Sequence, residues 1–169
     1  MSKAVLISIR PRWCEKIVNG NKTIEVRKTR PKMNTPFKCY IYCTLPKYPH
    51  EDFIATNYPM PQFYGGGKVI GEFTCERIAL IAYDGGELSS TTNAAFSPAT
   101  CLTQSEIIAY IGDKGRCYGW HMSNLRIYDT PRELSEFTGL RNTRFGAEPY
   151  DIKRPPQSWG YVQEVTCDE

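Results

Sequence analysis

The chain has no long apolar run, no strong excess of either charge and only two histidines. Its longest apolar runs, such as residues 4–7 and 78–82, are far short of the ~18 residues that a membrane helix needs. The net charge of +3 excludes a protein that coats nucleic acid with its whole surface, but it allows a local basic patch. The first residues contain no apolar region followed by a small-residue cleavage site. We therefore expect a cytoplasmic protein with no membrane partner.

Metal-binding and phosphate-cradling patterns are also missing. The two histidines, His50 and His121, have no ligand-like spacing. Cys39 and Cys43 lie four residues apart on an expected strand, ~13 Å along it, which is too far to share one zinc ion. The glycines at 65–67 lack the Lys-Ser or Lys-Thr of a phosphate-binding loop and precede an expected strand. The sequence predicts no metal site and no cofactor.

Cysteine is plentiful, but its pattern does not indicate disulfide bonds. The chain has seven cysteines, an odd number, scattered mostly among apolar residues. We interpret them as reduced, buried thiols. Cys14 lies in the first turn of an expected helix, where a thiolate is favoured. A cysteine nucleophile therefore stays possible, although no histidine is paired with Cys14 in the sequence.

Length and composition fit one domain that spans residues 1–169. Hydrophobic residues make up 41% and charged residues 23%, a globular balance. Apolar alternation and β-forming residues predict strands at residues 4–9, 23–28, 37–44, 68–78 (or to 83), 118–122, 125–128 and 158–165. Start and stop signals predict helices at residues 11–20 and from 103 onwards, with a third short capped turn at 130–137.

Three long segments without regular structure complete this pattern, at residues 45–67, 84–101 and 138–156. Loops of this length are usually functional or mobile. Gly71, inside an expected strand, predicts a bulge or a close backbone approach. Short strands, two or three short helices and long loops together predict a small α+β barrel.

Three polar residues gather around one short strand near the N-terminus. Alternation places Glu25 and Arg27 on the same side, with Lys22 at the strand entrance. Such a group could bind a phosphate or a base edge, and the carboxylate could act as a general base. The alternative is a solvated sheet face that carries an ion pair.

A basic run overlaps this strand. Five cations fall within 12 residues: Arg27, Lys28, Arg30, Lys32 and Lys38. Arg10, just before the first helix, adds another positive charge. Such clustering is an electrostatic footprint for phosphate, and a merely solvated charged face is the alternative.

Two aromatic segments are candidates for base contacts. Trp120 beside His121 could form a stacking wall with a polar tip. Two prolines before the last strand fix the directions of the three residues that follow, namely Gln157, Ser158 and Trp159. In both segments the alternative is a tryptophan that belongs to the core.

The stretch SIRPRWCEKIVNGNKTIEVRKTR resembles the signature of the ASCH family, a Gly-x-Lys-x-x-Glu-x-Arg run after the first helix. All four positions match here, at Gly20, Lys22, Glu25 and Arg27. Further segments are similar to ASCH proteins of phages and prophages: RPKMNTPFKCYIYCT, KVIGEF, YGWHMSNLRIYDTPRELSEF and RPPQSWGYV. The likeness covers most of the chain outside the long loops.

This resemblance implies a PUA-like β-barrel whose cleft is lined by the signature residues. The family is associated with RNA binding, and some members act on RNA or on modified nucleosides. One branch deacylates N4-acetylcytidine with a lysine at the place of Lys22, but it has threonine where this chain has Glu25. Its second catalytic glutamate has only Glu106 as a counterpart, and Glu106 is better explained as a helix cap.

Three functional hypotheses follow. The first is a module that binds RNA or a modified nucleotide without chemistry. The second is a hydrolase or ribonuclease that uses Lys22 and Glu25. The third is a phage-encoded protein that sequesters a nucleotide or blocks a host protein, with the long loops as the working surface.

Overall fold

The computed structural model describes residues 2–47, 53–54 and 63–165 of the chain. Within these residues it contains eleven strands, two α-helices and several short 3-10 helices. The helices are α1 (Pro11–Val18) and α2 (Gln104–Ile111). The strands are β1 (Lys3–Ile9), β2 (Ile24–Arg27), β3 (Phe37–Cys43), β4 (Phe53–Ile54), β5 (Phe63–Tyr64), β6 (Lys68–Asp84), β7 (Glu87–Ser90), β8 (Arg116–Arg132), β9 (Thr138–Thr143), β10 (Gly146–Asp151) and β11 (Trp159–Gln163).

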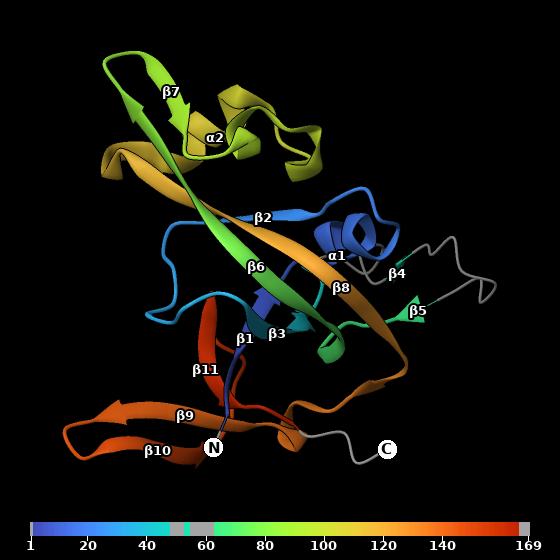
Figure 1. The fold of residues 1–169 in the computed structure, drawn as a ribbon. Coiled ribbons are helices and arrows are strands. Elements are labelled where there is room, and N and C mark those ends of the chain that lie inside the picture. Colours follow the sequence, from blue (N-terminus) through green and yellow to red (C-terminus); the bar gives the residue numbers. More distant parts are fainter. Residues whose placement is uncertain (1, 48–52, 55–62, 166–169) are drawn as a thin grey trace.

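One sheet carries the fold, with strand order β10-β9-β11-β1-β3-β6-β8-β2 and β7 paired to β6. β1 and β3 are parallel, with α1 on the connection between them, and the other pairs in the sheet are antiparallel. β6 and β8 have 17 residues each and cross the molecule as a long ribbon (Figure 1). The β9–β10 hairpin lies at the opposite end of the sheet, next to β11 (Figure 1).

The predicted barrel is not formed by this strand order. Among the described residues, β10 and β2 stand at the two ends of the order and do not pair with each other. Seventeen residues of strand extend roughly 55 Å, well beyond the neighbouring strands β3, β7 and β2, which have seven, four and four residues. One part of this ribbon packs against α2.

Local signals placed α1 and α2 correctly. Pro11 occupies the first position of α1, and Gly20 follows the helix with a positive φ of 76° that suits glycine. Thr103 and Glu106 form the predicted capping box of α2. Both helices then bury one apolar face against the sheet.

Hydrophobic clusters lie on both faces of the sheet. The largest joins Cys14 and Ile17 of α1 to the inner side chains of β1 and β3 and to Trp120 of β8. A second lies under α2 and includes Ile107, and a third on the opposite face includes Phe137. The signature strand β2 lies where the first two clusters meet.

Several predicted boundaries were wrong. Residues 118–122 and 125–128 are parts of one strand, β8, which passes through Asn124 with a positive φ of 49°. The third expected loop, 138–156, contains the β9–β10 hairpin, and the second, 84–101, contains β7 and two 3-10 helices. The expected cap at Thr130 is instead provided by Glu133. Much of the first expected loop, 45–67, lies outside the described residues.

Gly71 occupies the predicted close approach. The register of β6 shifts on both sides of this residue, against β3 and against β8. A Cβ atom at Gly71 would collide with the backbone carbonyl oxygen of Arg126. Only glycine, which has no Cβ atom, fits at this position.

No helix in the described part of the chain is long and apolar enough to cross a membrane.

Candidate functional site

Strand β2 brings the signature residues together at the junction of α1, the ribbon and the last strand. In the antiparallel register with β8, Glu25 lies opposite Trp120 and Arg27 lies opposite Tyr118. Lys22 precedes the strand, and its ammonium lies 5.1 Å from the ring centre of Trp13 on α1. The three charged groups thus share the α1 side of the sheet, as alternation predicted.

The three side chains form one chain of ion pairs. Nζ of Lys22 lies 3.3 Å from Oε2 of Glu25, and Nη2 of Arg27 lies 2.9 Å from Oε1. Nε of Arg27 also donates to Oε1, at 3.0 Å. Lys22 directs its short hydrogen bond elsewhere, to the backbone carbonyl of Thr100 at 2.6 Å. Glu25 is therefore bound firmly to Arg27 and only electrostatically to Lys22.

These ion-paired side chains are buried. The alternative of a solvated sheet face had predicted that they would be exposed. Lys22 is 3% exposed and Glu25 is 5% exposed. Oε2 of Glu25 accepts no hydrogen bond within the described residues, and neither does the indole N–H of Trp120 donate one. An acceptor and a donor without a hydrogen bond thus sit on cross-strand neighbours, although the acceptor is ion-paired with Lys22. Buried polar groups of this kind are uncommon away from functional sites.

Arg27 links the signature to the approach of the last strand. Its Nη1 donates to the carbonyl and the hydroxyl oxygens of Ser158 at 3.3 and 3.2 Å, and its Nη2 donates to the carbonyl of Ser8 at 2.7 Å. The Ser8 hydroxyl in turn donates to the carbonyl of Pro156 at 2.6 Å. These bonds engage every nitrogen of the guanidinium. Arg27 thus ties β2 to the end of β1 and to the residue before β11.

Trp159 lies at the solvent-exposed edge of the site, which we call the rim, whereas Trp120 is buried in the core. The indole N–H of Trp159 donates to the hydroxyl of Thr29 at 3.0 Å, and its ring is partly exposed. Trp120 is 0% exposed and packs against Trp159 and Phe37, with ring centres 6.0 Å apart in each case. The expected stacking wall at Trp120 is thus wrong, because the ring is covered on all sides by the core.

His121 lies on the other side of β8, away from this rim. Its Nε2 shares a hydrogen bond of 3.1 Å with the hydroxyl of Thr92. Partial burial, and next the charge of Arg77, lower the pKa of His121 below its ordinary value of 6.5. The expected partnership of Trp120 and His121 in one base-binding wall fails, because adjacent strand residues face opposite sides. Gln157 is exposed beside Ser158.

The basic run contains ion-paired cations and exposed cations without an ion pair. Lys38 pairs with Glu72 and Glu164 at 3.6 and 3.4 Å and so falls outside the phosphate footprint. Four other candidates are exposed and form no ion pair within the described residues: Arg10, Lys28, Arg30 and Lys32. In the sequence, Lys28 and Arg30 flank Thr29, the residue that holds the indole of Trp159. The ammonium of Lys28 lies 5.2 Å from the ring centre of Tyr110 on α2.

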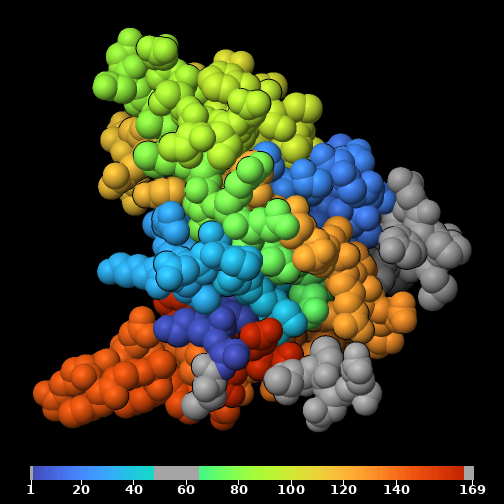
Figure 2. All heavy atoms as spheres, viewed as in Figure 1, coloured from blue at the N-terminus to red at the C-terminus, as the bar shows by residue number. Residues whose placement is uncertain are grey.

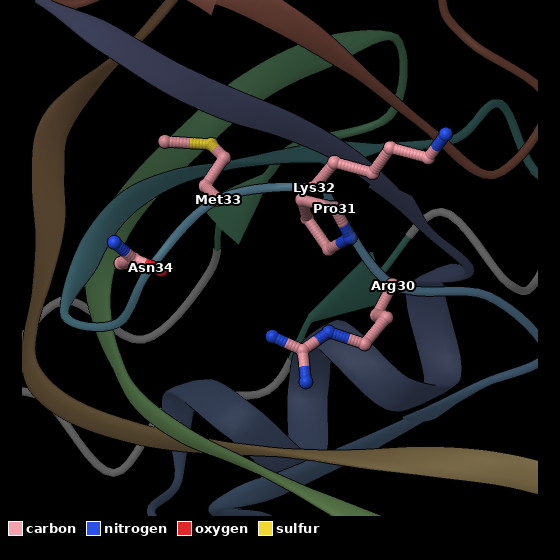
Figure 3. A pocket seen from close by; sticks show the side chains of 5 residues that line it. All are labelled: Arg30, Pro31, Lys32, Met33 and Asn34. Atoms are coloured by element: carbon pink, nitrogen blue, oxygen red, sulfur yellow. The ribbon is translucent and has the colours of Figure 1, made fainter.

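An open hollow lies under the segment that follows β2. Its volume is about 640 Å³, and it is lined by residues 30–34. Figure 3 shows the guanidinium of Arg30 turned into this space, while the side chain of Lys32 extends away from it. The backbone N–H of Lys32 donates to the hydroxyl of Tyr161 at 2.8 Å, which ties the segment to β11. The hollow thus presents one unpaired cation beside the Trp159 rim.

Two possible catalytic groups have structural roles instead. Burial raises the pKa of the Cys14 thiol well above its ordinary value, and the Cys43 thiol beside it raises it further. Helix position alone would favour a thiolate, but desolvation disfavours the charged form more strongly. Glu106 is exposed and bonded to the backbone N–H and hydroxyl of Thr103, which lower its pKa. Within the described residues no three metal-ligating side chains cluster.

Sequence reasoning missed the partners that complete the site. Ser8, Thr29 and Thr100 hold Arg27, Trp159 and Lys22 respectively. Ser8 and Thr100 contribute backbone carbonyls, which any residue could supply, so no residue type marks them. Thr29 lies within the basic run. Only its position between two cations, and not its residue type, could have suggested a role for it.

Comparison with solved structures identifies the fold of this chain. No protein-family model matches the chain, and no curated protein matches it. The crystal structure of ASCH from Zymomonas mobilis aligns with a TM-score of 0.61 and 19% identity, over 95% of this chain and 88% of that one. A serine-to-alanine variant of that protein gives 0.61 and 18%, over 95% and 89%, and a tyrosine-to-phenylalanine variant gives 0.55 and 17%, over 96% and 92%. The chain therefore has the fold of these ASCH structures.

Proposed function

From this ASCH fold, we propose that the chain binds RNA or a modified nucleotide at the rim formed by Trp159 and the segment that it contacts, residues 29–32. The observation that carries the proposal is the hydrogen bond from the partly exposed indole of Trp159 to Thr29, the residue directly before Arg30. Arg30 and Lys32 on this segment are exposed and form no ion pair within the described residues. A partly exposed aromatic ring bonded to a segment with exposed cations offers a base a stacking face and the phosphates a counter-charge.

The buried ion chain explains how this rim is held in place. Arg27 fixes Ser158, the residue before Trp159, and Glu25 fixes Arg27. Removing charged groups from water costs several kcal/mol per ion, and a hydrophobic replacement is often equally stable. A buried Lys–Glu–Arg chain is therefore a poor way to gain stability. It is a good way to orient a contact residue, and in this proposal Lys22, Glu25 and Arg27 position the rim rather than touch the ligand.

The proposal is tested by titrating a fluorescein-labelled 12-nucleotide oligouridylate at several salt concentrations. Trp159→Ala should weaken binding about 5-fold or more, because stacking contributes ~1–3 kcal/mol per base. Its salt dependence should not change. Arg30→Gln should lower the log–log salt slope by about 0.7, the value for one phosphate contact. Phe96→Ala, at a partly exposed ring on another element, is the control.

The two alternatives are separated in the same preparation. Mass spectrometry of the RNA after incubation, together with a panel of modified nucleosides, reports any hydrolysis. A product lost in Lys22→Met would favour the hydrolase, and a nucleotide that co-purifies with the protein would favour sequestration. Absence of binding by oligouridylate and by the nucleoside panel would overturn the proposed function and leave a protein partner as the remaining hypothesis.

A further inference from the structure

A series of contacts runs from the segment at residues 30–34 across β11 to Asn142, near the tip of the β9–β10 hairpin. The backbone of Lys32 is bonded to the hydroxyl of Tyr161, and the ammonium of Lys3 lies 4.7 Å from the centre of the same ring. Lys3 then donates to Oδ1 of Asn142 on β9 at 3.4 Å. Two residues beyond Asn142, Arg144 begins the hairpin tip, and its guanidinium lies 4.6 Å from the ring centre of Phe145.

Lys3, Tyr161 and Asn142 lie on one face of the sheet. In the β1–β11 register Lys3 pairs with Gln163 and Val5 pairs with Tyr161, and cross-strand partners point to the same side. Tyr161 also lies opposite Leu140, which shares its face with Asn142. In Figure 2 the light-blue segment after β2 and the orange hairpin project from the same side of the molecule, with the N-terminal strand between them.

This series of residues contains three cations and two aromatic rings. Lys32, Lys3 and Arg144 form no ion pair within the described residues. Phe145 is 80% exposed, the highest exposure among the large hydrophobic side chains of the described part. Of the two carboxylates on β10, Glu148 pairs with Arg141, and alternation places both on the other face. Asp151 lies opposite Thr138, at the end of β10 away from the tip, 3.9 Å from the ammonium of Lys153.

From this pattern we infer that a single-stranded nucleic acid lies along a track formed by Lys32, Tyr161, Lys3, Arg144 and Phe145. The inference rests on the proposed function and extends it beyond the Trp159 rim. Trp159 and Tyr161 are in edge contact, with ring centres 5.4 Å apart, so the track begins where the rim ends. Cations that follow the backbone and rings on which bases stack are the two elements of sequence-tolerant single-strand binding. One nucleotide occupies the rim, and a longer strand also reaches the hairpin.

The test compares a mononucleotide, uridine monophosphate, with 12-nucleotide oligouridylate and oligodeoxythymidylate. Lys3→Gln should lower the salt slope for the RNA 12-mer by about 0.7. Phe145→Ser should weaken 12-mer binding about 5-fold or more and leave the slope unchanged. Neither change should affect the mononucleotide. Lys114→Gln and Phe96→Ser are matched exposed controls on other elements, and both should bind like the unmodified protein.

Ultraviolet crosslinking of the 12-mer, with peptides mapped by mass spectrometry, gives an independent readout, with adducts expected at Tyr161 or Phe145. If the 12-mer binds but the track variants match their controls and adducts map elsewhere, the track is wrong and the Trp159 rim stands. If neither the mononucleotide nor a 12-mer binds, both proposals fall. Stronger binding of the RNA 12-mer than of its DNA counterpart identifies RNA as the strand, and the reverse identifies DNA.

Discussion

The carboxylate of Glu25 and the guanidinium of Arg27, two residues apart on β2, meet at a single oxygen. Nε and Nη2 of Arg27 lie 3.0 and 2.9 Å from Oε1 of Glu25, and both side chains are nearly covered, at 11% and 7% exposure. The second oxygen of Glu25 faces the ammonium of Lys22. One carboxylate thus balances two buried cations, and the site depends on its charge.

Replacing this carboxylate should destabilise the protein. Glu25→Gln leaves the charges of Lys22 and Arg27 buried without a counter-ion, and breaking a buried pair costs about 3–5 kcal/mol. Urea denaturation should therefore show a loss of about 3 kcal/mol in the free energy of unfolding. Glu87→Gln, at an exposed strand position without an ion pair, should stay within about 0.5 kcal/mol. If Glu25→Gln lowered the free energy of unfolding by less than about 1 kcal/mol, water would have to hydrate Lys22 and Arg27 in place of the carboxylate.

Gly71 should not tolerate a side chain. The Cβ atom of Gly71→Ala would meet the backbone carbonyl oxygen of Arg126, which is fixed in the β6–β8 ladder and cannot rotate away. Overpacking of this kind costs about 1–3 kcal/mol, measurable as a lower melting temperature. Gly160→Ala is the matched control, because its nearest neighbour would lie 3.6 Å away, at ordinary contact distance. Equal melting temperatures for the two variants would contradict the close approach.

The charge state of His121 should make stability depend on pH. Burial, and then the charge of Arg77, lower the pKa of His121 in the folded protein below 6.5, whereas the charge of Glu76 acts in the opposite direction. The unfolded chain then binds more protons, so stability falls as pH drops through 6.5 towards the folded pKa. Melting temperatures between pH 7.5 and 5 should decline, and His121→Gln should flatten that decline.

A second decline at lower pH should have a different origin. Hydrogen bonds from the N–H and hydroxyl of Thr103 lower the pKa of Glu106, and a bond from Arg132 lowers that of Glu136. Carboxylates with lowered pKa values stabilise the fold above their ordinary value of 4.5, and that contribution is lost below it. If His121→Gln removed the decline below pH 4.5 as well, the assignment to His121 would be wrong.

Thiol reactivity should separate one cysteine from the buried set. Cys101 is partly exposed, whereas Cys14, Cys39, Cys43, Cys75 and Cys117 are buried. Burial raises the pKa of Cys75 to about 12 and that of Cys117 to about 11. In native protein at pH 8, Cys101 should be alkylated well before these five, as peptide mapping can follow. Fast labelling of Cys14 would instead restore it as a candidate nucleophile. After unfolding, all seven thiols should react.

Local patterns were enough for elements whose stability depends on near neighbours. A proline at the first position and a glycine after the end delimited α1, and the Thr103–Glu106 capping box located α2. The prediction of two separate strands within β8 was wrong because this strand depends on a distant partner. Ser123 and Asn124 have the composition of a turn, and Asn124 does adopt a positive φ. Pairing with β6 on both sides of that residue nevertheless carries the strand through.

The sequence by itself determined which chemical groups stand on β2, because the two-residue period of a strand places Glu25 and Arg27 together wherever the strand lies. Only the tertiary structure decided how exposed they are. The hydrogen bonds that engage Lys22 and Arg27 come from Thr100, Ser158 and Ser8, residues up to 131 positions away. The same long-range packing covers Trp120 and leaves Trp159 at the surface. Alternation specifies a face, but the layers that pack on that face decide whether it meets the core or the solvent.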